Sequence, residues 1–263
     1  MYGTAPYEVA VIHGGPGAAG GMAPVAKHLA KKRGVLEPLQ TARSLEGQVE
    51  ELKLLLEKNG TLPAILIGHS WGAWLSLIVA ARHHEIVRKL ILVGSGPFED
   101  KYVEYIKRAR FNRLSEDEKI EYESILDHIN NPQILDKSPF FARLSELSKK
   151  TDSYDPIKLK AEEDTASILV DQPGEIFTSV WKDAAEFRSS GKLVEPAKDV
   201  NCPVVAIHGD YDSHPAEGVR KPLAEVIKDF RFILLEKCGH HPWEEKQARD
   251  GFFRILDNEI AIK

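Results

Sequence analysis

The chain has 263 residues, 43% of them hydrophobic, which is enough to bury the core of one substantial domain and a smaller insertion. A formal net charge of -5 argues against binding to nucleic acid or to an anionic membrane surface. The two cysteines, Cys202 and Cys238, fit no zinc or disulfide pattern, and no signal peptide or membrane-spanning stretch is recognisable. We therefore expect a soluble protein of the reducing cytoplasm.

The first elements alternate between strand and helix patterns. Residues 7–12 are rich in β-branched side chains and run into the turn sequence HGGPG at 13–17, as a buried strand entering a loop does. Pro24 marks the first turn of a helix that Gly34 stops. A second strand is predicted at 35–39.

The next two elements have clear boundaries. Ser44 is predicted to cap a helix in which Val49 and several leucines recur at helical spacing, and Gly60 ends it. The run from Leu62 is apolar at nearly every position, which is typical of a central parallel strand. Residues 71–81 are apolar almost all round and predict a buried helix. Such alternation predicts βα units and a parallel sheet.

The composition changes after Pro97. Residues 98–175 are charged and lack long apolar runs of the strand type, but they include helical stretches at 101–110 and 117–129. We interpret this region as an inserted helical cap.

The sheet pattern then resumes. Strands are predicted at 203–207 and 232–235, and a final helix at 243–260. The domain hypothesis is therefore a core made of residues 1–97 and 176–263, interrupted by the cap.

A G-x-S-x-G motif, Gly68-His69-Ser70-Trp71-Gly72, stands between the apolar strand and the apolar helix. A serine hydroxyl becomes an effective nucleophile when a tight strand-to-helix turn exposes it to a base. The start of the following helix also directs N–H groups and positive potential at the place where an oxyanion would form. The motif in this context predicts Ser70 as a nucleophile.

The glycine-rich loop after the first strand is the predicted partner of that turn. A tetrahedral intermediate needs two hydrogen-bond donors, and glycines allow backbone N–H groups to approach the substrate oxygen closely. We assign the donors to the N–H groups of Trp71 and Gly15, with Gly14 as the alternative to Gly15. His13 is interpreted as a residue that braces the loop.

Two late loops offer the acid and the base. The loop after the first late strand carries Asp210 and Asp212, and the loop after the second carries His240 and His241. Both follow the carboxyl ends of their strands, where open α/β sheets build their sites. The chain order of Ser70, an aspartate and a histidine is that of α/β-hydrolases, and it differs from the chymotrypsin and subtilisin orders.

With these motifs in place, the sequence resembles the α/β-hydrolase superfamily over residues 7–97 and 200–260. The resemblance implies an α/β fold, with a mostly parallel central sheet flanked by helices and an inserted helical cap. In that superfamily the orienting acid commonly stands three residues after the glycine of the first late loop, which selects Asp212. The base follows a glycine after the last strand, which selects His240 and completes a triad with Ser70.

The HGGPG loop and the sequence Ser70-Trp71-Gly72 also resemble the proline iminopeptidase branch, whose members remove N-terminal residues from small peptides. The chain departs from that branch at His69, where glycine is usual, and in lacking a leading β-hairpin. His69 is interpreted as a hydrogen-bonded side chain under the turn.

These observations predict a serine hydrolase that cleaves a small ester or amide through an acyl-enzyme, with neither cofactor nor metal. The alternatives are an aminopeptidase, a C–C hydrolase, or a small-molecule receptor on a hydrolase fold. An aminopeptidase needs a carboxylate for the substrate's α-amine, and the acidic candidates in the cap are Glu162, Glu163, Asp164 and Glu175. A short peptide therefore stays among the expected substrates.

Overall fold

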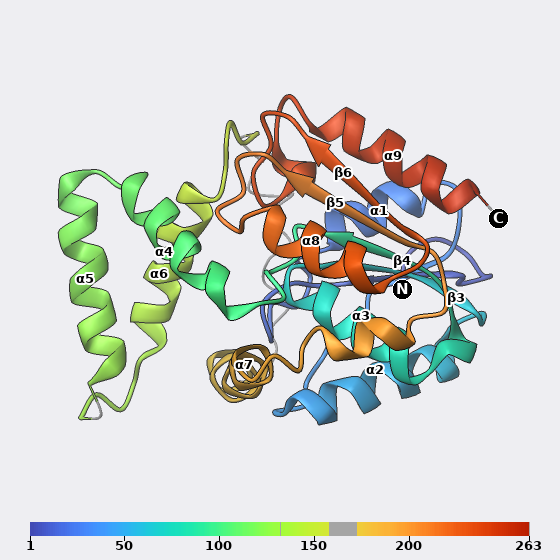
Figure 1. The fold of residues 1–263 in the computed structure, drawn as a ribbon, viewed down its shortest axis with the longest axis horizontal. Helices are drawn as coiled ribbons and strands as arrows, with labels where there is room; N and C mark the ends of the chain where they lie inside the picture. Colours follow the sequence, from blue (N-terminus) through green and yellow to red (C-terminus); the bar gives the residue numbers. More distant parts are fainter. Residues whose placement is uncertain (132, 158–172, 263) are drawn as a thin grey trace.

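A single six-stranded sheet forms the centre of the computed structural model, which describes residues 1–131, 133–157 and 173–262 (Figure 1). The strand order is β2-β1-β3-β4-β5-β6, and every neighbouring pair is parallel. The strands are β1 (Val9–Ile12), β2 (Val35–Leu36), β3 (Ala64–His69), β4 (Val87–Val93), β5 (Val204–Gly209) and β6 (Phe230–Leu235). The predicted fold class, a parallel sheet between helices, is confirmed.

Helices cover both faces of the sheet because alternate residues of each strand point to opposite sides. Val9 and Val11 of β1 pack on one face, and Ala10 and Ile12 pack on the other. The first face is covered by α1 (Ala23–Leu29) and α9 (Arg249–Ala261), and the second by α2 (Leu45–Asn59), α3 (Trp71–Arg82) and α8 (Glu217–Val226). The sheet is therefore buried on both sides, as the apolar strand runs predicted.

The strand order reverses at β1. The chain moves from β1 to β2 on one side and then crosses to β3 on the other. In open α/β sheets, such a reversal of strand order marks the place where the loops at the carboxyl ends of the strands form binding sites. The HGGPG loop and Ser70 both lie at this point of the sheet.

Several predicted boundaries are confirmed. The Ser44 side chain accepts a hydrogen bond from the Gly47 N–H at 3.1 Å, so it caps α2, and Gly60 follows the last residue of that helix. Residues 71–80 of α3 are all buried. Both cysteines are free thiols.

Two boundaries differ from the predictions. The second strand ends at Leu36 and not at 39, because Pro38 has no N–H to donate to a neighbouring strand. The last helix starts at Arg249 and not at 243, because Glu245 forms an isolated antiparallel bridge with Pro156 of another segment. A short 3₁₀ turn precedes that bridge.

The helices after β4 form a lobe at the side of the sheet, away from both chain termini (Figure 1). Its members are α4 (Val103–Asn112), α5 (Glu116–Asn130) and α6 (Ser138–Thr151). Leu114, Ile125 and Leu147 form a small apolar core of the lobe's own. This arrangement fits the predicted cap, whose limits at 98 and 175 stay a prediction.

A further helix, α7 (Pro173–Ser189), lies between the lobe and the core (Figure 1). Its Ile176, Val180 and Ala184 belong to the same apolar cluster as the sheet. No helix in the described residues is both long and apolar enough to cross a membrane. The 3₁₀ turns are η1 (His84–Ile86), η2 (Asp100–Tyr102), η3 (Glu195–Asp199) and η4 (Pro242–Glu244).

Candidate active site

Ser70 occupies a strained turn between β3 and α3. Its φ of 52° and ψ of -115° place a residue with a side chain in a region that such residues rarely adopt. The Ser70 N–H donates to the carbonyl of Val93 at 3.0 Å, which fixes the turn to the end of β4. The serine side chain is half-buried at the carboxyl edge of the sheet.

Gly72 explains why this turn can lie so close to β1. A β-carbon at Gly72 would lie 2.3 Å from the carbonyl oxygen of Ile12 and 2.6 Å from that of His13. No side chain can occupy that space, so the glycine of the motif allows α3 to begin directly against the end of β1. The serine turn and the HGGPG loop are thereby brought together.

The HGGPG loop lies beside the serine. A β-carbon at Gly14 would lie 3.1 Å from Ser70 Cβ, and Gly15 has a φ of +41°. Within residues 1–131, 133–157 and 173–262, the backbone N–H groups of Gly15 and Trp71 form no hydrogen bond to a backbone carbonyl of a turn or loop. His13 Nδ1 donates to the Gly14 carbonyl at 2.9 Å, in keeping with the expected bracing role.

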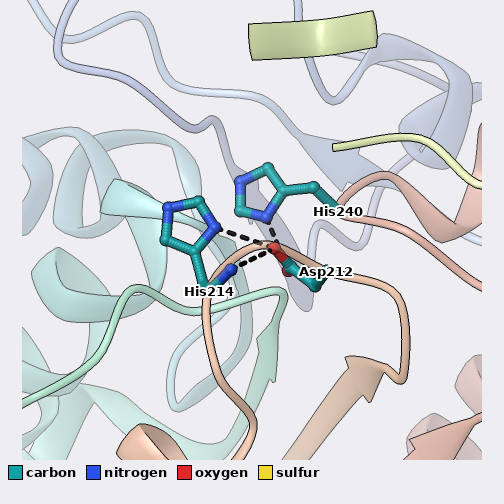
Figure 2. A group of neighbouring side chains, drawn as sticks. All are labelled: Asp212, His214 and His240. Carbon is teal, nitrogen blue, oxygen red and sulfur yellow. Dashed lines mark hydrogen bonds and ion pairs between the residues drawn. The ribbon is translucent and has the colours of Figure 1, made fainter. Parts of the chain in front are cut away.

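The structure brings Asp212 and His240 together (Figure 2). His240 Nδ1 lies 2.7 Å from Asp212 Oδ2, and both residues are buried. A carboxylate oxygen only accepts hydrogen bonds, so Nδ1 of His240 carries the proton and Nε2 is left as an acceptor. An imidazole in this tautomer can take a proton from a hydroxyl group.

The charges of this pair stabilise each other. Burial alone would lower the pKa of His240, but the Asp212 charge and hydrogen bond outweigh it and raise that pKa above its ordinary value. Burial would raise the pKa of Asp212, yet His240 and His214 hold it well below its usual range. Asp212 is thus an anion at neutral pH.

Asp210 has a different place. Its Oδ1 accepts the backbone N–H of Cys238 at 3.1 Å. Asp210 thereby joins its own loop, after β5, to the loop after β6 that carries His240, which we call the histidine loop. Of the two loop carboxylates, Asp212 is the one that contacts His240.

Gly94, directly after β4, fits beneath His240. A β-carbon there would lie 2.8 Å from the His240 carbonyl oxygen and 3.5 Å from Asp212 Oδ2, and Gly94 has a φ of +50°. Close approach and backbone conformation both require glycine at this position. Nothing in the local sequence around Gly94 indicates this role, because the role depends on a loop that lies far along the chain.

His69 and His241 surround the same loop. His69 Nε2 donates to the His240 carbonyl at 3.0 Å, so His69 has the structural role expected of it. Burial and the neighbouring His240 and His241 keep its pKa well below the ordinary value. His241 is half-buried, and its partial burial together with His240 lowers its pKa to about 3.

A third imidazole was missed in the sequence. His214 Nδ1 lies 2.8 Å from Asp212 Oδ1, and its ring stacks on His240 with centroids 4.4 Å apart (Figure 2). In the described residues, Asp212, His214 and His240 form the one group close enough together to suggest a metal site. Zinc ligands keep about 3.3 Å between each other in a tetrahedral site, so separations of 2.7 and 2.8 Å indicate hydrogen bonds instead.

Comparisons with known proteins identify the family of the chain. Residues 11–255 match the alpha/beta hydrolase family. This chain is a member of the alpha/beta hydrolase family.

One curated relative of this α/β-hydrolase is a proline iminopeptidase from Saccharolobus solfataricus, 26% identical over 222 residues. The match covers 81% of this chain and 66% of the relative, so the chain spans just under two thirds of that protein's length.

Solved structures of two other enzymes share the fold. A proline iminopeptidase from Mycobacterium smegmatis is 18% identical, with a TM-score of 0.68 and coverage of 98% of this chain and 91% of the other. A meta-cleavage product hydrolase from Pseudomonas fluorescens is also 18% identical, with a TM-score of 0.64 and coverage of 98% and 93%.

In this α/β-hydrolase the lobe formed by α4, α5 and α6, which we call the cap lobe, contacts the histidine loop through the segment that follows α6. The backbone N–H of His240 donates to the carbonyl of Asp152, the residue after α6, at 2.8 Å. Arg110 of α4 binds the Asp152 carboxylate through two hydrogen bonds of 2.9 and 2.6 Å. Burial would raise the pKa of Asp152, but the Arg110 charge lowers it below its ordinary value.

Glu245 also joins the histidine loop to the segment after α6. Its buried carboxylate accepts the N–H groups of Gly239, Tyr154 and Asp155 at 2.9, 2.8 and 2.8 Å. The segment that follows α6 is therefore fastened to the histidine loop along several residues. Nothing in the local sequence around 152 or 245 signals this pairing.

Of the four acidic cap residues proposed for an α-amine, one lies in the described structure. Glu175 is exposed and forms an ion pair with Arg43 at 2.9 Å. Glu162, Glu163 and Asp164 lie outside the described residues.

Proposed function

We propose that this α/β-hydrolase is a serine hydrolase in which Ser70 is the nucleophile, His240 the general base and Asp212 the orienting acid. The observation that carries the proposal is the 2.7 Å hydrogen bond between His240 Nδ1 and Asp212 Oδ2. This bond leaves Nε2 of His240 as a proton acceptor. The strained Ser70 turn lies next to the His240 loop, since His69 Nε2 donates to the His240 carbonyl.

In the proposed reaction, Ser70 Oγ attacks a carbonyl carbon while Nε2 of His240 takes the hydroxyl proton. The N–H groups of Gly15 and Trp71 donate to the oxyanion that forms. His240 then gives its proton to the leaving group, and an acyl-enzyme remains. Water, activated by the same imidazole, releases the acid and restores Ser70.

A fluorophosphonate probe tests the nucleophile directly. The wild type is expected to be labelled and Ser70→Ala is expected not to be. The matched control is Ser76→Ala, because Ser76 lies on the same helix but is fully buried. Equal labelling of wild type and Ser70→Ala would contradict the proposal and favour a receptor that retains a hydrolase fold.

For the substrate, we propose a small ester or an uncharged amide. Glu175, the one acidic cap candidate among the described residues, is exposed and paired with Arg43, so it offers no buried carboxylate for a substrate ammonium group. A carboxylate that binds such a group in a desolvated pocket needs burial next to the reacting carbonyl.

The second candidate is an aminopeptidase that releases an N-terminal residue, which the similarity to a curated proline iminopeptidase supports. The deciding comparison is kcat/KM for a prolyl naphthylamide, its N-acetylated analogue and a short acyl ester. A preference for the ester or the acetylated amide supports the first candidate. A strong preference for the free amine would establish the second.

A further inference from the structure

Two imidazole rings share the carboxylate of Asp212 (Figure 2). Oδ2 accepts from Nδ1 of His240 at 2.7 Å. Oδ1 accepts twice from His214, from the backbone N–H at 2.9 Å and from ring Nδ1 at 2.8 Å. The half-buried His214 ring also stacks on His240 at an interplanar angle of 27°.

The two bonds from His214 have different requirements. The backbone N–H bond to an aspartate two residues earlier is an ordinary Asx turn, which any residue other than proline can form. The bond from Nδ1 needs a side-chain donor in that position. Because a carboxylate oxygen only accepts, the His214 ring must carry its proton on Nδ1.

These bonds restrict the carboxylate. An anionic carboxylate oxygen has two lone pairs, and both lone pairs of Oδ1 are used by His214. His208 Nε2, which lies 3.5 Å from Oδ2, donates to the His214 carbonyl at 2.7 Å instead. Only Oδ2 is left for His240.

We infer that His214 is a positioning residue for the base: its ring N–H holds the Asp212 carboxylate so that Oδ2 alone faces His240. This inference rests on the proposed function, because it assigns a role to His214 only if His240 acts as the base. Through Asp212, the His214 ring sets both the orientation and the proton affinity of the His240 imidazole.

The charge of the group supports this arrangement. Burial lowers the pKa of His214 and outweighs the opposing effect of Asp212, so the ring stays a neutral donor near pH 7. The other titratable or charged groups that surround the three side chains are His69 on β3, Arg110 on α4, Asp152 after α6, His208 on β5 and His241 in the histidine loop.

Three substitutions separate the contributions of His214. His214→Asn keeps a neutral side-chain donor close to the position of Nδ1 but loses the stacked ring. His214→Phe keeps a ring but has no donor, and His214→Ala has neither. All three retain the backbone N–H that forms the turn.

The inference predicts that His214→Asn retains kcat within about threefold, whereas Phe and Ala each lower kcat about ten- to a hundredfold, as expected for a lost hydrogen bond to a charged group. KM is expected to change little, since Asp212 and His214 contact the base and not the substrate.

The pH dependence adds a readout that simple packing would not affect. Without the His214 donor, the Asp212 carboxylate becomes a stronger acceptor and stabilises protonated His240 more. The acidic limb of kcat/KM is then expected at higher pH in His214→Phe and His214→Ala, and unchanged in His214→Asn.

Two results would overturn the inference in folded proteins: wild-type kcat in all three variants, or full activity in His214→Phe with loss in His214→Asn. The fluorophosphonate experiment keeps the two proposals separate. If wild type is not labelled at Ser70, the proposed function fails. If labelling succeeds and the variants behave alike, only the role of His214 fails.

Discussion

The turn that carries Ser70 and the loop that carries His240 contact each other through the hydrogen bond from His69 to the His240 carbonyl, but different parts of the molecule support them. The Ser70 turn is fixed by the strands beside it, through the close approach of Gly72 to β1 and the hydrogen bond to Val93 of β4. The His240 loop is fixed by core contacts from His69 and Asp212 and also by the segment after α6, which supplies the Asp152 carbonyl. The core therefore shapes the candidate nucleophile, and the cap lobe helps to place the candidate base.

This difference has a functional meaning. A change in the cap lobe acts on the His240 loop first and reaches the Ser70 turn only through the His69 hydrogen bond. Catalysis by general bases depends on distances within a fraction of an ångström, and a misplacement of 1 Å can cost about a hundredfold in rate. Substitutions on the two sides should therefore have separable effects on rate and on stability.

The largest effect on the base side is expected from Asp212→Asn. An amide can present the wrong partner to Nδ1 and reverse the tautomer of His240, which would lower kcat by about four orders of magnitude, the size seen in the trypsin case. Asp210→Asn is the matched control, since Asp210 contacts the Cys238 N–H and not His240. A greater loss in Asp210→Asn than in Asp212→Asn would refute the assignment of the orienting acid.

Gly94→Ala probes the contact between β4 and the base. The added β-carbon would lie 2.8 Å from the His240 carbonyl, so the loop must shift, and we expect kcat to fall about a hundredfold. Gly191→Ala is the control: Gly191 also has a positive φ, of +77°, but an added β-carbon there has no atom within 4 Å. If both variants keep the wild-type kcat, the position of His240 does not depend on Gly94.

Much of the serine side could be predicted from sequence because its determinants are consecutive. The apolar run of β3, the motif at 68–72 and the apolar α3 specify a strand, a turn and a helix with no need for distant residues. Asp212 and His240 were also selected, since each follows a late strand at a spacing that the hydrolase resemblance provides.

The cap's contribution could not be predicted in this way. Arg110 and Asp152 are 42 residues apart. Only the folded chain shows that they pair and that the Asp152 carbonyl accepts the N–H of His240. In sequence both look like charges on solvated helix faces, the most common situation for such residues. His214 gave a weak signal, a donor two residues after an aspartate, which did not indicate a second imidazole on the same carboxylate.

Arg110→Met is expected to reduce stability more than activity. Asp152 would be left as a buried charge with no partner, which costs about 3 kcal/mol in comparable cases. Thermal or urea unfolding measures this loss, and kcat should fall about tenfold as the segment after α6 loosens. The double variant Arg110→Met/Asp152→Leu should recover stability, because no charge is then buried alone.

Arg143→Met is the control for charge loss in the same lobe. Arg143 pairs with Glu121 and Glu146 at the exposed surface, where ion pairs contribute little. We expect wild-type kcat in this variant. Equal effects of Arg110→Met and Arg143→Met would mean that the cap lobe does not support the base through Asp152.

The smallest expected effect is a shift in the pH dependence of kcat/KM. It tests most directly whether Asp152 and Arg110 act on His240, because the direction of the shift depends on the sign of the charge that is removed. His240 must be neutral to act as a base, so kcat/KM should fall as the pH drops through its raised pKa, above the ordinary value of about 6.5. In addition to the Asp212 charge, the Asp152 charge raises the pKa of His240, and the Arg110 charge lowers it.

Asp152→Asn should therefore move the acidic limb of kcat/KM to lower pH, and Arg110→Met should move it to higher pH. In the double variant Arg110→Met/Asp152→Asn the two changes oppose each other, and the limb should return toward that of the wild type. Profiles of kcat/KM against pH for the four proteins measure this, and shifts in the same direction for both single variants would show that the loop moves as a whole, with no separate electrostatic effect of the two charges on His240.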